Sequence, residues 1–281
     1  MQPPTHTHNA PTRFFSLFYH LAVMSKVVIV TGASRGIGRA AVLEALTKFD
    51  SRVIAIARST TGLEQLQQHV STLNKADQLE VVVGDVTNQD VARKAIHIAL
   101  ERWGRLDSVI ANAGVIEPIA TIANSSVEDW KTLFDINVFS IVSLAQLALP
   151  HLRKSEHGSF ITVSSGAAIK GYHGWGAYGS SKAAVNLINS TLAVEEPNVT
   201  SIAIRPGVVD TEMQNMIRST GASGMKDDHA KFIELHRDGK LVKPEDPAHV
   251  LAALANQPPK HLSGGFFSWN DEDMKPFNRA K

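Results

Sequence analysis

Short apolar runs alternate with longer periodic stretches along most of the chain. Seven short runs are rich in β-branched and other apolar residues, at positions 26–30, 52–57, 79–83, 106–110, 159–163, 201–204 and 265–269. Between several of these runs, apolar residues recur at helical spacing, as they do in 88–103 and 182–194. Short continuous apolar runs are typical of buried strands, and the longer periodic stretches are typical of helices. The pattern therefore predicts alternating strands and helices.

This alternation indicates one particular architecture. Strands that are apolar on both faces and separated by helices form parallel sheets that are covered on both sides. We therefore predict an α/β fold with a doubly wound, seven-stranded parallel sheet and helices on both faces. In such folds ligands bind beyond the carboxyl ends of the strands, where the strand order reverses. The functional residues are therefore expected just after strands.

Composition narrows the range of functions. Of 281 residues, 43% are apolar and 20% are charged, and 28 basic side chains nearly balance 27 acidic ones. A net charge of +1 without a Lys/Arg stripe predicts no nucleic-acid partner. The lack of cysteine excludes disulfides and thiolate ligands, and the 12 histidines form no metal-binding pair, so no metal site is predicted. The length fits a single domain over 25–281.

Residues 1–24 differ from the rest of the chain. They contain Pro3, Pro4 and Pro11, and no acidic residue occurs before Glu44. The apolar stretch 14–24 is too short to span a membrane, so no membrane association is predicted. A basic, acid-poor start also has the character of a mitochondrial targeting peptide. We interpret 1–24 as a flexible extension of a cytoplasmic protein, with targeting as the alternative.

A glycine-rich turn, TGASRGIG at 31–38, directly follows the first predicted strand. Gly32, Gly36 and Gly38 remove side chains where a backbone must turn tightly and approach a pyrophosphate. The pyrophosphate then rests against the amide groups at the start of the next helix. No Gly-Lys-Ser/Thr follows, so the turn is not a nucleotide-hydrolysing P-loop. Its position between strand and helix predicts a dinucleotide site.

The end of the second predicted strand bears on the choice of cofactor. Enzymes that prefer NAD commonly place an acidic residue there, against the ribose 2′-hydroxyl. This chain has Arg58 instead, and Arg35 lies in the glycine turn. Two guanidinium groups suit a 2′-phosphate. The sequence therefore favours NADPH/NADP+, although both arginines also suit a solvated surface.

Four polar residues suit the reduction of a carbonyl group. Tyr178 and Lys182 lie one helical turn apart, Ser165 follows the run 159–163, and Asn137 lies in a helix-like stretch. A phenol with a pKa near ~10 is a poor proton donor at neutral pH, and we expect the ammonium of Lys182 to lower that pKa. Ser165 would polarise the carbonyl. Lys182 would also hold the nicotinamide ribose, and Asn137 would hold a water that links Lys182 to solvent.

Together these motifs resemble the short-chain dehydrogenase/reductase family in order and spacing, from residue 25 to about 273. They are TGASRGIG, Asp85 in GDVT, Asn112-Ala113-Gly114, Asn137, Ser165, YGSSK at 178–182 and Arg205-Pro206-Gly207 through Thr211. The resemblance implies a Rossmann-type fold, a tetrad of Asn137, Ser165, Tyr178 and Lys182, and homodimers or homotetramers. It also implies cofactor contacts by Gly32, Ser34, Arg35, Gly36, Ile37, Gly38, Arg58, Asp85, Val86, Asn112, Ala113, Gly114, Tyr178, Lys182, Pro206, Gly207, Val209 and Thr211.

The second half of the chain is similar to the sepiapterin reductases and the fungal benzil reductases within that family. This implies NADPH-dependent reduction of a 1,2-dicarbonyl, either a benzil-like α-diketone or the side chain of a pterin. It also implies substrate contacts by Ser165, Tyr178 and Asp271, and a mobile substrate lid at 211–243. Trp175 is a further candidate for the substrate wall, with core packing as the alternative, and Asp271 equally suits a solvated tail. A non-catalytic NADP(H) sensor or scaffold, or a dehydrogenase acting on another alcohol or ketone, are the competing functions.

Overall fold

The computed structural model describes residues 25–279, so the extension predicted at 1–24 lies outside the described residues. A seven-stranded, wholly parallel sheet runs through the molecule, with the strand order β3-β2-β1-β4-β5-β6-β7. The prediction of a doubly wound Rossmann-type sheet is therefore confirmed. The strands are β1 Val27–Thr31, β2 Arg52–Ala57, β3 Leu79–Val83, β4 Ser108–Ala111, β5 Gly158–Val163, β6 Val199–Arg205 and β7 Phe266–Ser268.

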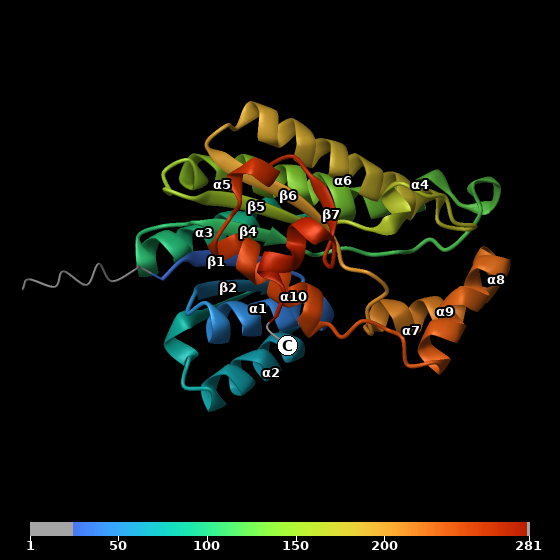
Figure 1. The fold of residues 1–281 in the computed structure, drawn as a ribbon, viewed down its shortest axis with the longest axis horizontal. Coiled ribbons are helices and arrows are strands. Elements are labelled where there is room, and N and C mark those ends of the chain that lie inside the picture. The colour runs from blue at the N-terminus through green and yellow to red at the C-terminus, as the bar shows by residue number, and fades with distance from the viewer. Residues whose placement is uncertain (1–24, 280–281) are drawn as a thin grey trace, which may run out of the picture.

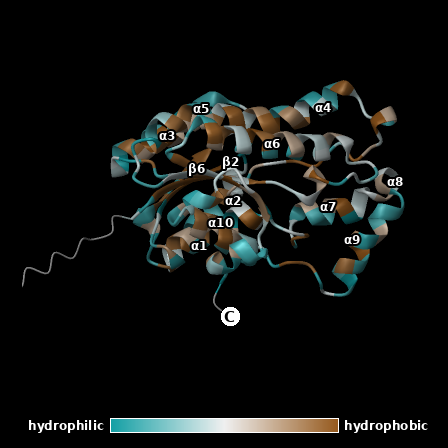
Figure 2. Ribbon diagram, turned by 45° about the horizontal axis from the view of Figure 1, so that its top comes forward, coloured by the Kyte–Doolittle hydropathy of each residue, from teal (hydrophilic) through white to brown (hydrophobic). Residues whose placement is uncertain are grey.

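Helices cover both faces of the sheet (Figure 1). One layer contains α1 Gly36–Lys48, α2 Thr60–Thr72 and α10 Glu245–Asn256, and the other contains α3 Gln89–Trp103, α5 Ser140–Leu152 and α6 Gly176–Glu195. Leu46, Leu66 and Leu251 bury the first layer against one face, and Leu144 and Val185 bury the second against the other. Figure 2 shows hydrophobic residues concentrated between the two layers. Burial on both faces explains why the strands are continuously apolar instead of alternating.

The ends of the strands depend on pairing that the sequence does not reveal. The sixth strand begins at Val199, two residues earlier than predicted, because Val199 pairs with Gly158 of β5. The seventh is limited to Phe266–Ser268, because only these three residues pair with β6. Both differences lie within the usual uncertainty of element boundaries.

A single irregular turn interrupts the longest helical run. Helix α4, Val127–Phe134, continues through a π-helical segment, Asp135–Phe139, directly into α5. Among the described residues this run, 127–152, is by length and composition alone apolar enough to cross a membrane. Its buried Leu144, Ala148 and Leu152 belong to the core cluster against the sheet, which accounts for the apolar composition. Short π segments of this kind are frequent at functional sites.

Three short helices form a separate group beyond the carboxyl ends of the strands (Figure 1). They are α7 Glu212–Thr220, α8 Ala222–Met225 and α9 Asp227–Arg237, and we call them the lid because they lie within the predicted lid at 211–243. Backbone hydrogen bonds from Val242 N to Val208 O (2.9 Å) and from Asp210 N to Val242 O (2.9 Å) join the two ends of this segment. The lid therefore leaves and rejoins the sheet domain at one place.

Candidate active site

A cleft of about 1050 Å³ lies at the carboxyl ends of the strands, across the neighbouring strands β1 and β4, where the strand order reverses. This volume exceeds the ~300–1,000 Å³ typical of a pocket for one small ligand, as a site for a dinucleotide plus a substrate requires. Most of the predicted cofactor residues line it: Gly32, Ser34, Arg35, Gly36, Ile37, Arg58, Asp85, Val86, Asn112, Ala113, Gly114, Tyr178, Lys182, Pro206 and Thr211. The sheet topology therefore brings together motifs that lie far apart in the chain.

The glycine turn forms a cradle into which no side chain fits. Gly32 and Gly36 have positive φ values of 67° and 54°, which other residues rarely adopt. A Cβ on Gly38 would lie 2.3 Å from Gly32 O, so only glycine allows α1 to begin this close to β1. The bare backbone and the free amides at the start of α1 suit a pyrophosphate. These residues therefore fit the dinucleotide that the sequence predicts.

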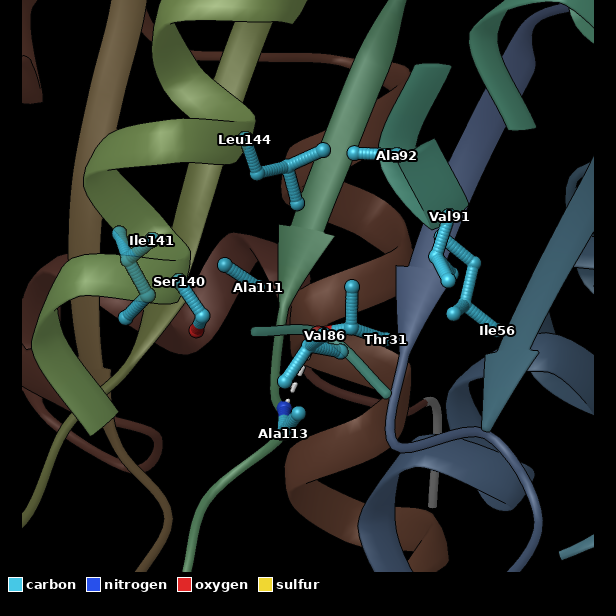
Figure 3. A pocket seen from close by; sticks show the side chains of 10 residues that line it. All are labelled: Thr31, Ile56, Val86, Val91, Ala92, Ala111, Ala113, Ser140, Ile141 and Leu144. Atoms are coloured by element: carbon cyan, nitrogen blue, oxygen red, sulfur yellow. Dashed lines mark hydrogen bonds between the residues drawn. The ribbon is translucent and has the colours of Figure 1, made fainter. Parts of the chain in front are cut away.

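Thr31 holds the turn against the loop that follows β4. Its Oγ1 accepts hydrogen bonds from Asn112 N and Ala113 N, both at 3.0 Å, and Asn112 Nδ2 donates to Thr31 O at 2.8 Å. Beneath lies a small cavity of about 10 Å³ between β1, β4, α3 and α5 (Figure 3). Val86 and Ala113 line both this cavity and the cleft, so the cavity lies directly under the cleft floor. Its volume barely reaches that of one water molecule.

Two arginines and an acid line the cleft beside the glycine turn and the ends of β2 and β3. The side chain of Arg58 is 64% exposed, and its Nη1 lies 3.6 Å from Asp85 Oδ2. Partial burial raises the pKa of Asp85, but hydrogen bonds from Thr87 N and Thr87 Oγ1, together with the charge of Arg58, outweigh burial and hold that pKa below its ordinary value. Asp85 is therefore a carboxylate at neutral pH, while Arg35 also lines the cleft. The guanidinium of Arg58 is free to swing from this weak pair to an incoming phosphate.

Tyr178 and Lys182 lie on the first two turns of α6, and both line the cleft. Burial raises the pKa of Tyr178, and a hydrogen bond with the Ser165 side chain only partly offsets this. The net direction is therefore opposite to the sequence prediction, which is wrong because burial outweighs the effect of the Lys182 ammonium, whose Nζ lies 5.9 Å from the ring centroid. Tyr178 is thus a neutral phenol at pH 7, the form that a proton donor must have.

Lys182 is held by the backbone and weakened as a base by burial. Its Nζ donates to Val163 O at 2.8 Å, and burial lowers its pKa from 10.5 to about 8. Among residues 25–279, no carboxylate opposes this shift. The amine therefore remains mostly protonated at neutral pH, one helical turn from Tyr178, but it titrates near the working range of an enzyme.

Asn137 projects from the π-helical segment toward the loop that follows β4. Its Nδ2 donates to Val115 O (2.8 Å) and to Ser181 Oγ (3.1 Å), and its Oδ1 accepts from Val115 N (2.8 Å). A Cβ on Gly114 would lie 3.2 Å from Asn137 Oδ1 and 3.5 Å from Lys182 Nζ, so the bare glycine separates the two side chains. Asn137 therefore anchors this loop, and its predicted role in holding a water stays a prediction.

The structure places some predicted residues away from the cleft wall. Trp175 is buried behind Tyr178, with ring centroids 5.6 Å apart, and does not line the cleft. Asp271 lies after β7, where its Oδ2 accepts from Ser268 N at 2.6 Å, and it does not line the cleft either. Gly207 and Val209 contact Val242 at the base of the lid. These four residues therefore lie beside the cleft and do not line it.

Sequence reasoning missed the apolar end of the cleft. Val115 and Ile116 line the cleft from the loop after β4, and Met213 and Met216 line it from α7, among the polar Glu117, Glu212, Asn215, Ser219 and Thr220. The spacing of Met213 and Met216, one helical turn apart and just after Thr211, was a signal that could have identified them. Flexible methionines on a short helix suit a flat apolar ligand.

Comparisons with known proteins agree with this geometry. The family model described as short chain dehydrogenase matches residues 26–222. A benzil reductase ((S)-benzoin forming) from Saccharomyces cerevisiae is 40% identical over 264 residues, which cover 90% of this chain and 99% of the relative. A crystal structure of a short chain dehydrogenase/reductase from the same yeast is 40% identical, with a TM-score of 0.86, and covers 91% of this chain and 100% of that one.

Two further structures bear on cofactor and location. A Saccharomyces cerevisiae structure described as a cytoplasmic protein of unknown function is 41% identical, with a TM-score of 0.75, covering 91% of this chain and 100% of that one. A Shigella flexneri short chain dehydrogenase complexed with NADP is 26% identical, with a TM-score of 0.72, covering 88% of this chain and 97% of that one. The chain therefore belongs to the short-chain dehydrogenase/reductase family and is a short-chain oxidoreductase.

Proposed function

We propose that this chain is an NADPH-dependent carbonyl reductase that reduces one carbonyl of a benzil-like 1,2-dicarbonyl. The observation that carries the proposal is that Tyr178 and Lys182 line one cleft together with the glycine cradle, while the side chain of Ser165 hydrogen-bonds with Tyr178. A protein that only bound a dinucleotide would have no chemical need for a buried phenol bonded to a serine hydroxyl there. That argument disfavours the sensor or scaffold alternative.

The residues divide the chemistry between them. A bound dihydronicotinamide supplies the hydride for the carbonyl carbon. Tyr178 donates its phenolic proton to the carbonyl oxygen, so that C=O becomes CH–OH and the phenolate remains. The ammonium of Lys182 then stabilises the phenolate electrostatically. The hydroxyl of Ser165, bonded to the same phenol, donates to the developing oxyanion.

The shape of the cleft favours the diketone over the pterin. Val115, Ile116, Met213 and Met216, which belong to the same cluster as Tyr178, give this part of the cleft apolar surface that suits phenyl rings. The pterin alternative depends on Asp271 as the anchor for a polar edge, and that carboxylate is engaged with Ser268 N outside the cleft wall. Adjacent carbonyls are also unusually electrophilic. A benzil-like α-diketone is therefore the preferred substrate.

We also propose the cofactor preference, assembly and location of the protein. Arg58 and Arg35 at the adenosine end of the cleft support NADPH over NADH. Phe139, Leu187 and Val194 are 58%, 70% and 80% exposed, and such apolar side chains support a homodimer or homotetramer. A cytoplasmic location is supported by the yeast relative described as a cytoplasmic protein.

The test is a panel of carbonyl compounds assayed by loss of NADPH absorbance. We expect turnover with benzil and diacetyl, and weaker turnover with sepiapterin. Tyr178→Phe should bind NADPH with wild-type affinity and lose nearly all turnover, since it lacks only the transferable proton. Tight NADPH binding without turnover across the panel would favour the sensor, whereas activity only on simple alcohols or ketones would favour another dehydrogenase.

A further inference from the structure

The lid is fastened to the loop that leads into the catalytic helix. His173 Nδ1 lies 2.6 Å from Gly224 O in α8, and His173 N donates to Asp228 Oδ2 at 2.8 Å in the first turn of α9. A carbonyl oxygen only accepts, so the hydrogen of the imidazole is on Nδ1. His173 therefore binds the lid through both its ring and its backbone, and we call these two hydrogen bonds the clamp.

Two glycines allow this close approach. Gly174 has a positive φ of 78°, and a Cβ there would lie 2.4 Å from Gly224 O. A Cβ on Gly224 would lie 2.2 Å from Ile119 O. Ala120 N also donates to Gly174 O at 3.0 Å. Three chain segments thus meet at backbone contact distance, which leaves little freedom for the loop at 172–175.

A row of contacting aromatic rings connects the lid to Tyr178, the proposed proton donor. Phe232 of α9 is buried with its ring centroid 5.2 Å from that of Trp175, and Trp175 meets Tyr178 edge-on at 5.6 Å and 77°. Trp175 is also the residue before α6, and its carbonyl accepts from Gly179 N at 2.7 Å. The lid therefore packs, through the Trp175 side chain, against the ring of Tyr178, and Trp175 itself does not line the cleft.

We propose that His173 is a positioning residue that clamps the lid to the catalytic loop and so fixes the orientation of Tyr178. The lid then has two roles, because α7 walls the cleft with Met213 and Met216 while α8 and α9 brace the proton donor from behind. Loss of the clamp frees the lid and the loop together. The proposal rests on the proposed function for its kinetic consequence, but the clamp itself is a contact that can be tested without turnover.

The experiment compares His173→Ala with His173→Asn in the full-length protein. The amide nitrogen of asparagine lies close to where Nδ1 does, so Asn keeps a donor for Gly224 O, whereas Ala removes it. His236→Ala is the matched control, because His236 is an exposed histidine in the last turn of α9. Asp228→Ala attacks the same clamp from the lid side and serves if His173→Ala does not fold.

Two readouts are taken on each variant. Limited trypsin digestion with mass spectrometry follows cleavage after Lys226, Lys231 and Arg237, and steady-state kinetics with benzil give kcat and KM. Loss of one net hydrogen bond predicts roughly fivefold faster cleavage in the lid for His173→Ala. We expect kcat to fall by roughly the same factor with the NADPH Kd unchanged, and His173→Asn to restore both.

The outcomes separate the two proposals. Wild-type protection of the lid in His173→Ala, or wild-type kcat despite faster cleavage, would overturn the positioning role. Failure of His173→Asn to recover would also overturn it, since a donor to Gly224 O would then be irrelevant. A wild-type protein that reduces no 1,2-dicarbonyl would refute the proposed substrate class. The digestion pattern would still test whether the clamp holds the lid.

Discussion

The charge of Lys182 should set the upper pH limit of carbonyl reduction. Burial lowers the pKa of its amine from 10.5 to about 8, with no carboxylate in the described part of the chain to oppose the shift. Because the shift is downward, the ammonium that stabilises the Tyr178 phenolate is present below about pH 8 and is lost above it. Roughly nine tenths of Lys182 is charged at about pH 7 and roughly one tenth at about pH 9. Turnover should therefore fall by about tenfold between these two pH values.

The assay is the initial rate of NADPH consumption with saturating benzil, at constant ionic strength, from about pH 6 to about pH 10. Far-ultraviolet circular dichroism at each pH value separates titration from unfolding. Lys182→Arg keeps a positive charge that does not titrate in this range, so any residual activity should lose its alkaline decline. A wild-type rate that stays flat through about pH 9.5, or an alkaline limb that persists unchanged in Lys182→Arg, would refute the assignment.

Three further predictions test other parts of the cleft. Arg58→Ala should weaken NADPH binding by roughly tenfold and leave NADH binding within about twofold, because one charge-assisted contact to the 2′-phosphate is lost. Titration calorimetry measures both affinities, with Arg93→Ala as the exposed control, and equal losses for the two nucleotides would contradict the assignment. Thr31→Val should lower the free energy of unfolding by about 2 kcal/mol, since Asn112 N and Ala113 N lose their acceptor. In urea denaturation Thr31→Ser should be close to wild type, and equal stability of the two variants would contradict the role of the Thr31 hydroxyl. Gly38→Ala should abolish NADPH binding, because its Cβ would lie 2.3 Å from Gly32 O. The control Gly171→Ala, whose Cβ would have no atom within 4 Å, should bind NADPH normally, and retained affinity in Gly38→Ala would show that the cradle is not the phosphate site.

Local patterns were sufficient to predict the sheet and the glycine turn, whereas the cofactor residues after β3 and β4 were implied only by the resemblance to the family. Each strand is a short apolar run bounded by a turn, and the residues after β1, β2, β3 and β4 meet at one edge because parallel strands end there together. Gly38, in the first turn of α1, could be identified because it belongs to a glycine-rich sequence that joins a predicted strand to a predicted helix. These inferences need only the order of elements along the chain.

Features that depend on burial or on tertiary contacts could not be predicted in this way. The pKa of Tyr178 is raised instead of lowered, because the fold buries the phenol away from water. The presence of a lysine four residues away in the sequence does not reveal this burial. Trp175 was a candidate for the substrate wall, yet it packs between Phe232 and Tyr178. That arrangement arises from a contact between residues about sixty positions apart, and no periodicity in either segment reports it.

The π-helical segment at Asp135–Phe139 has a consequence for how this chain can be altered. A regular helix advances by about 100° per residue, so the extra residue fixes the rotational phase between α4 and α5. Deleting one residue there would convert the run to an ordinary helix and rotate α4 by about a quarter turn relative to the sheet. Asn137 would then leave Val115 and Ser181. Insertions and deletions are therefore forbidden in this stretch even where single substitutions are tolerated, and redesign of the neighbouring wall must preserve its length.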